Sequence, residues 1–157
     1  MHPNRPQVRE KMDVGARVPP TRQRRGKVLV IDDDEQYLKL TSRILRGAGY
    51  DVVARSEGIG TSAAVSAERP DLVLIDLSMP GLDGDRLAVL IQRSMARPPL
   101  LVLYSGMSAA VLEKRAAACG AIAAIPKGLP PEQFLKRVAS ILERMPEVAP
   151  PEDPPEK

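Results

Sequence analysis

The sequence predicts an α/β fold in which helices cover both faces of a doubly wound, five-stranded parallel sheet. Five short, mostly apolar stretches alternate with five helical stretches at the spacing of βαβ units, whose strands pair in parallel. Hydrophobic residues make up 43% of the 157 residues, whereas aromatic residues make up only 3%. The core must therefore be aliphatic, which suits helices packed on a parallel sheet, and the length fits one domain with tails.

The first half of the chain is expected to hold three strands and three helices. The strands are expected at 28–31, 51–55 and 72–75. The helices are expected after residue 34, at about 58–68, and after Asp83. Gly47 and Gly49 end the first helix, and Asp83 is a good N-cap for the third, which carries Leu87, Leu90 and Ile91.

The second half is expected to hold two more strands and two more helices. The strands are expected at 100–104 and 121–125, and the helices at about 109–118 and from Pro131 onward. Gly120 is the expected C-terminal stop of the fourth helix. A stripe with Phe134, Leu135 and Val138 predicts the buried face of the last helix.

The two ends of the chain differ from the middle in charge and in proline content. Residues 1–26 carry a formal charge of +5, and residues 146–157 carry −3 with five prolines. Both segments are expected to be disordered, which leaves one domain at 27–145 that fills the chain. The basic arm lacks interleaved aromatic residues, so it is interpreted as solubilising, and nucleic-acid binding is not expected.

Cysteine and histidine usage excludes several kinds of site. Cys119 is the only cysteine, which rules out an internal disulfide, and it is interpreted as a small core residue near a helix end. His2 is the only histidine, so the chain lacks the residues for a histidine metal cluster. No apolar run has the length of a membrane span, and a soluble, cytoplasmic protein is expected.

Polar residues follow four of the predicted strands. In a parallel sheet the carboxyl ends of the strands meet at one edge, so these residues are expected to lie together. They are Asp32, Asp33 and Asp34 after the first strand, Asp76 after the third, Ser105 after the fourth and Lys127 after the fifth.

This set of residues fits phosphoryl transfer. Crowded carboxylates favour an oxygen-liking divalent cation, and Mg²⁺ is usually held by one or two carboxylates plus a phosphate. Asp76 stands alone at its strand end and is placed to act as a nucleophile that forms an aspartyl phosphate. Ser105 and Lys127 supply the hydroxyl and the ammonium that position and neutralise the phosphoryl group. Asp34 is interpreted as the N-cap of the first helix.

Over about residues 27–145 the chain resembles the receiver domain of two-component response regulators. The resemblance is carried by Val-Leu-Val-Ile-Asp-Asp-Asp at 28–34, by Asp-Leu-Val-Leu-Ile-Asp-Leu-Ser-Met-Pro-Gly-Leu-Asp-Gly at 71–84, and by Ser105 and Lys127 after their strands. It implies a flavodoxin-like fold with strand order 2-1-3-4-5.

The resemblance also implies roles for individual residues. Asp76 would accept phosphate from a sensor histidine kinase or a histidine phosphotransfer protein. Mg²⁺ would be bound directly by Asp33 with the help of Asp32, by Asp76, and by the backbone carbonyl of Ser78. Ser105 would hydrogen-bond the phosphoryl group and Lys127 would pair with it. Beyond this self-catalysed phosphorylation and dephosphorylation, no conventional enzyme activity is expected.

Two positions depart from the pattern of the family. Many receivers have proline after the lysine of the fifth strand, and an aromatic residue three positions before that lysine. This chain has Gly128 and Ala124 there. An alternative reading is therefore a receiver-like interaction module that works without phosphate. A phosphohydrolase is disfavoured because Ser78 stands where such enzymes place a second acid.

Overall fold

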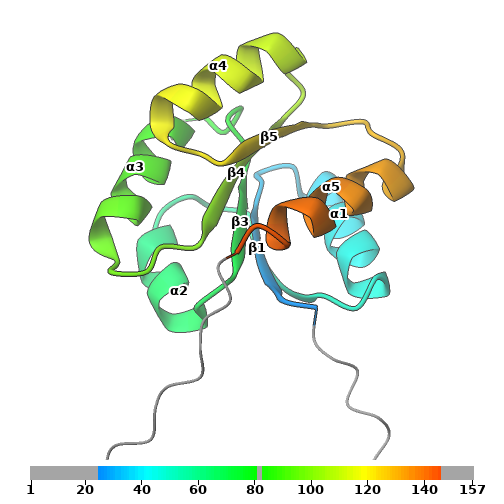
Figure 1. Cartoon of the computed structure of the whole chain (residues 1–157), viewed down its shortest axis with the longest axis horizontal. Coiled ribbons are helices and arrows are strands. Elements are labelled where there is room, and N and C mark those ends of the chain that lie inside the picture. Colours follow the sequence, from blue (N-terminus) through cyan, green and yellow to red (C-terminus); the bar gives the residue numbers. More distant parts are fainter. Residues whose placement is uncertain (1–24, 81–82, 146–157) are drawn as a thin grey trace, which may run out of the picture.

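The structure is a computed structural model that describes residues 25–80 and 83–145 (Figure 1). The expected basic arm, apart from its last two residues, and the expected acidic tail lie outside the described residues. Within the described part of the chain, no helix is both long and apolar enough to cross a bilayer.

Five parallel strands form one sheet in the order β2-β1-β3-β4-β5, which confirms the predicted fold class and strand order. The strands are β1 Lys27–Ile31, β2 Asp51–Arg55, β3 Leu72–Ile75, β4 Leu100–Ser105 and β5 Ala123–Pro126. Every residue of β3 is buried, as expected for a central strand covered on both faces.

Five helices alternate with the strands. They are α1 Glu35–Gly47, α2 Thr61–Glu68, α3 Gly84–Ser94, α4 Ala109–Cys119 and α5 Pro131–Leu142. Figure 1 shows α1 and α5 on one side of the sheet and α2, α3 and α4 on the other. Each face has its own aliphatic core: Leu45 and Val138 belong to one, whereas Val65, Ile91 and Leu112 belong to the other.

Local hydrogen bonds shift two of the predicted boundaries. The fifth strand begins at Ala123 instead of residue 121, because the Ala121 N–H bonds back to the Ala116 carbonyl at 3.0 Å and continues the helix end. Gly120 makes this turn possible with a left-handed φ of 78°. The second helix begins at Thr61 instead of about 58, after Gly60 in the same left-handed region.

Of the three apolar residues that the sequence places on the third helix, Leu90 is the one that does not pack against the sheet. Its side chain is 55% exposed, whereas Leu87 and Ile91 are buried against the sheet. A helix has 3.6 residues per turn, so Leu87 and Ile91 share a face and Leu90 lies to one side of it.

Candidate functional site

The sheet brings the predicted site residues to one edge. Asp76 follows β3, and its N–H extends the ladder to β1 by bonding the Ile31 carbonyl at 3.0 Å. Lys127 follows β5, and its N–H bonds the Ser105 carbonyl at 2.8 Å. The sequence places Ser105 just after the fourth strand, but in the structure it is the last residue of β4. Residues separated by nearly a hundred positions therefore meet where four parallel strands end.

Three carboxylates cluster at this edge. One oxygen from each of Asp32, Asp33 and Asp76 lies within 4.8 Å of the other two. Asp32 and Asp76 are buried, whereas Asp33 is exposed. The cluster therefore has two protected carboxylates and one that opens to solvent.

Lys127 compensates part of this negative charge. Its Nζ lies 2.7 Å from Asp32 Oδ2 and 3.0 Å from Asp76 Oδ2. Burial opposes the charge on the ammonium, but the contacts with Asp32 and Asp76 outweigh it and raise the pKa of Lys127. The lysine therefore stays protonated and bridges the two buried acids.

Burial dominates the electrostatics of Asp32. It raises the pKa of this carboxyl, and the nearby Asp76 acts in the same direction. The Lys127 ammonium and the Asp34 N–H, which bonds Asp32 Oδ1 at 3.0 Å, act in the opposite direction without cancelling the effect. The fold therefore holds Asp32 in a setting that disfavours its charge.

The donor set fits a magnesium ion. The three clustered carboxylates carry a formal charge of −3, and Lys127 contributes only one positive charge. Mg²⁺ prefers carboxylate and carbonyl oxygens and keeps several waters, and the exposed Asp33 leaves one side of the cluster open to them. A divalent cation at this place would balance the remaining charge.

Two serines lie beside the Asp76 carboxylate. The Ser78 N–H donates to Asp76 Oδ1 at 2.9 Å. The hydroxyl oxygens of Ser78 and Ser105 lie 3.1 Å apart, within hydrogen-bond distance. One oxygen of Asp76 is thus held by a backbone N–H and the other by Lys127, so the carboxylate is fixed in orientation.

The interpretation of Asp34 and Asp83 as helix caps is confirmed. The side chain of Asp34 accepts hydrogen bonds from the N–H groups of Gln36 and Tyr37 at the start of α1. Asp83 accepts from Asp85 and Arg86 at the start of α3. Asp34 therefore turns its carboxylate toward the helix and takes no part in the acid cluster.

Sequence reasoning missed an aromatic cage around Lys127. The Lys127 Nζ lies 4.5 Å from the centre of the Tyr37 ring and 5.6 Å from that of Tyr104. The Gly128 N–H donates to the Tyr37 hydroxyl at 3.0 Å. Tyr37 lies on the apolar stripe of the first helix, which can be seen in the sequence, but such a stripe predicts packing and not contact with a lysine.

Comparison with known protein families identifies the family of this chain. The sequence profile described as "Response regulator receiver domain" matches residues 28–139. The chain belongs to this family. The match runs from the second residue of β1 into the last helix and so includes parts or all of every strand and helix.

Relatives of this receiver domain are response regulators. The DNA-binding response regulator MtrA of Mycolicibacterium paratuberculosis is 31% identical over 120 residues, which make up 76% of this chain and 52% of MtrA. The putative two-component response regulator ARR21 of Arabidopsis thaliana is 32% identical over 111 residues, which are 69% of this chain and 18% of ARR21. The match thus spans about half the length of MtrA and less of ARR21.

Solved receiver domains share the fold. The BeF3-activated receiver domain of RstA from Klebsiella pneumoniae has a TM-score of 0.68 at 28% identity, with 75% of this chain and 99% of that one covered. A CheY-like receiver domain protein from Methanospirillum hungatei has a TM-score of 0.67 at 25% identity, with coverage of 74% and 93%.

Within this receiver, the two unusual positions have structural consequences. Gly128 adopts a φ of 92°, which proline cannot reach, and it keeps an N–H that proline lacks. Ala124 is half-buried, and its carbonyl accepts a hydrogen bond from Arg137 at 3.1 Å. Tyr104, buried on β4, shares a hydrogen bond of 3.2 Å with Thr41 and packs against Phe134.

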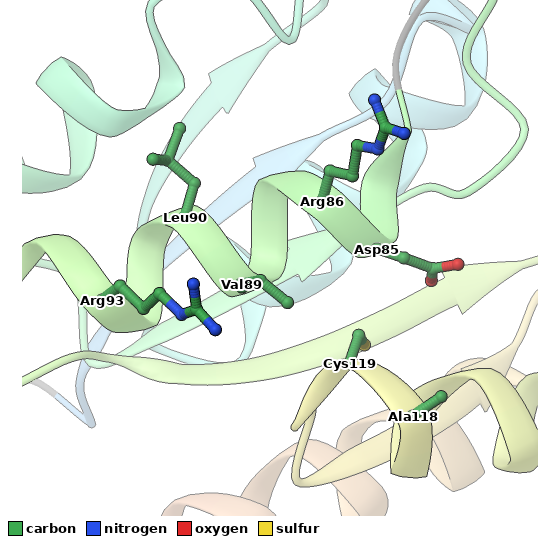
Figure 2. A pocket seen from close by; sticks show the side chains of 7 residues that line it. All are labelled: Asp85, Arg86, Val89, Leu90, Arg93, Ala118 and Cys119. Atoms are coloured by element: carbon green, nitrogen blue, oxygen red, sulfur yellow. The ribbon is translucent and has the colours of Figure 1, made fainter.

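A hollow between α3 and α4 lies apart from these residues (Figure 2). It has a volume of about 390 Å³ and contains none of the clustered acids, but Cys119 lies on its floor. The thiol is buried at the end of α4, and burial raises its pKa. The interpretation of Cys119 as a small core residue near a helix end is confirmed.

Proposed function

We propose that this receiver domain is a phosphoacceptor that takes a phosphoryl group from a histidine kinase, or from a histidine phosphotransfer protein, onto Asp76. The observation that carries the proposal is the setting of the Asp76 carboxylate. It is held between the Ser78 N–H and the Lys127 ammonium, and it lies beside Asp32 and Asp33. A packing role would not explain a buried acid that faces two other acids and a lysine.

The transfer is a displacement at phosphorus. A carboxylate oxygen of Asp76 forms the new P–O bond, and the P–N bond to the histidine of the donor breaks, leaving its electron pair on the imidazole nitrogen. Catalysis of such a step rests on positioning and on neutralisation of charge at the phosphoryl oxygens. Lys127 supplies a fixed ammonium, and the Ser105 hydroxyl supplies a hydrogen-bond donor at the neighbouring strand end.

Mg²⁺ is the cofactor that fits this chemistry. Asp32, Asp33, Asp76 and the backbone carbonyl of Ser78 would hold it. When bound, the ion neutralises charge on the acids and on the incoming phosphoryl group. The chain's own residues set the orientation: Lys127 holds Asp76, and the Asp34 N–H holds Asp32.

We further propose that the domain acts in the cytoplasm and signals through protein partners. Receivers of the family interact with kinases and with downstream targets. The expectation that the chain does not bind nucleic acid stays a prediction, because the MtrA relatives are described as DNA-binding response regulators.

One experiment tests the phosphoacceptor role. The protein is incubated with acetyl phosphate and Mg²⁺, and its intact mass is measured over time. We expect the mass of one phosphoryl group to be gained by the wild type and by Asp83→Asn, which keeps a capping side chain in the same loop. Asp76→Asn should gain nothing.

The same experiment separates the alternative function. A receiver-like interaction module that works without phosphate is favoured by Ala124, since no aromatic ring is available there to respond to Ser105. Under that function the wild type gains no phosphoryl group, or gains it equally in Asp76→Asn. Either result would overturn the phosphoacceptor proposal.

A further inference from the structure

A groove of about 460 Å³ runs between β5 and α5, and none of the clustered acids lines it. Its floor contains the half-buried Ala123 and Ala124 of β5, whose methyl groups leave the surface hollow. β5 is an edge strand, so one row of its backbone groups faces away from the sheet. Figure 1 shows this strand between α4 and α5. We name this feature the β5–α5 groove.

The β5–α5 groove is positively charged. Lys136 and Arg137 line it from α5, and Arg144 lines it from just beyond the end of that helix, against the single acid Glu113 of α4. The three cations are exposed, and none of the ion pairs among the described residues involves them. Arg137 is held along the groove by its hydrogen bond to the Ala124 carbonyl. Cations gathered without carboxylate partners provide a surface for an acidic ligand.

The chain itself contains a segment of the matching chemistry. Residues 146–157 begin directly after the described Met145 and carry four acids against one lysine. Five of these residues are prolines, which favour an extended polyproline conformation and lower the entropy lost on docking. Extended proline-rich segments are commonly bound in shallow surface grooves.

The segment is long enough to reach the whole groove. Arg144 is one residue from the end of the described chain, so the segment starts beside one groove cation. Arg144 lies two residues beyond the end of α5, so its distance from Arg137 along the helix axis is about 10 Å at about 1.5 Å per residue. In the polyproline conformation residues 146–157 would span about 37 Å at about 3.1 Å per residue. The segment can therefore turn back and pass over both cations and the floor.

We propose that residues 146–157 dock in the β5–α5 groove of their own chain, with acids on Lys136 and Arg144 and prolines over Ala123 and Ala124. The attached segment has a high effective concentration at the groove, so weak contacts suffice. The segment then covers the exposed edge of β5. A separate acidic partner can bind there only by displacing it. This inference does not depend on phosphorylation of Asp76.

Paramagnetic relaxation in the full-length protein tests the docking. A nitroxide is attached at Pro155→Cys in a Cys119→Ala background, so that one site is labelled. We expect the amide signals of Ala123, Ala124 and Ser140 to lose most of their intensity at low salt. They should recover at about 1 M salt, where the Debye length is about 3 Å.

Two charge variants make the test specific. Lys136→Gln/Arg144→Gln removes two groove cations and should restore the signals. Lys39→Gln/Arg43→Gln removes two exposed cations of α1 and should leave the broadening unchanged. Broadening that persists in the groove variant would overturn the proposal.

Two other occupants are distinguished by the same label. A sample that mixes labelled protein with unlabelled, isotope-enriched protein reports contact between copies, and groove broadening in that sample would assign the groove to a second chain. Broadening at the start of β1 with none in the groove would mean that the basic residues 1–24 hold the segment instead. Each of these results contradicts the proposal.

Discussion

The Tyr37 hydroxyl accepts a hydrogen bond of 3.0 Å from the N–H of Gly128, across 91 positions of the sequence. The bond ties α1 to the loop that carries Lys127, and the Tyr37 ring lies against the lysine ammonium. Proline at position 128 would have no N–H to donate. The residue that departs from the family pattern therefore allows a contact that fixes the site lysine.

Tyr37→Phe should loosen this loop. The change keeps the ring beside Lys127 but removes the acceptor of the Gly128 N–H. We expect the free energy of unfolding to fall by about 0.5–1.5 kcal/mol, the typical net contribution of one hydrogen bond. Urea denaturation measures it, and amide exchange of Gly128 should accelerate.

Tyr50→Phe is the matched control for this change. Tyr50 is also a tyrosine of the α1 side of the core, but its hydroxyl makes no hydrogen bond within the described part of the chain. We expect its substitution to leave Gly128 exchange unchanged. Equal acceleration in both variants would mean that the Tyr37 hydroxyl has no specific role.

Asp32→Asn should stabilise the domain in the absence of divalent cations. Because the pKa of Asp32 is raised above its ordinary 3.8, the folded state loses stability as pH rises through the titration of this carboxyl. Asparagine removes the charge and can still accept the Asp34 N–H. We expect a gain of about 0.5–2 kcal/mol at neutral pH, the common range for a single stabilising substitution.

The control for Asp32→Asn is Asp33→Asn, which removes the same charge from an exposed position. Its gain should be smaller, because an exposed carboxylate keeps its hydration. The two variants are compared by thermal and urea denaturation with a chelator present. A loss of stability in Asp32→Asn would show that its contact with Lys127 outweighs the cost of burial.

Added Mg²⁺ should raise the melting temperature of the wild type. A ligand that binds only the folded state stabilises it by RT ln(1 + [L]/Kd), about 2.7 kcal/mol at a hundredfold excess over Kd. Asp33→Asn should lose most of this shift, since it removes the carboxylate that opens to solvent. Asp34→Asn removes a neighbouring acid but keeps the helix cap, so it should retain the shift. Equal shifts in both variants would contradict the assignment of Asp33.

Cys119 should react slowly with iodoacetamide in the folded protein. Burial raises the pKa of its thiol, so less thiolate is present at a given pH, and the pH profile of alkylation should move to the alkaline side of a free cysteine. Cys119→Ala/Ala118→Cys places the thiol one residue earlier at an exposed position and should react at the ordinary rate. Fast alkylation of native Cys119 would contradict its place in the core.

The sequence predicted the order of elements and the edge at which the site forms. The apolar runs that stop at Asp32 and Asp76 show where two strands end. Parallel pairing brings those ends together regardless of the conformation of the loops. Local capping was equally readable, because Asp34 and Asp83 interact with groups only two or three residues away. These predictions depend on short-range chemistry or on topology.

The contacts around Lys127 could not be predicted in the same way. Its reach to both Asp32 and Asp76, and the bond from Gly128 to Tyr37, depend on how α1 packs against the loop after β5. Residue spacing contains no information on that packing. The exposure of Leu90 could not be predicted either. The periodicity of α3 places this residue at the border between the buried and the exposed face, and packing decides which side it joins.

Binding of beryllofluoride, which mimics a phosphoryl group, should shift the amide signals around Lys127 more than those of α4. A group bound at Asp76 competes for the Lys127 ammonium, which now bridges two acids, and Tyr37 and Gly128 are in contact with that lysine. At position 124 a methyl group has no ring to reorient. A population shift follows the contacts that differ between the two states. We therefore expect the largest changes at Tyr37 and Gly128, and at Phe134, which packs against the Tyr104 ring beside Lys127. Asp76→Asn should show no changes. Shifts along α4 as large as those around Lys127 would contradict this route.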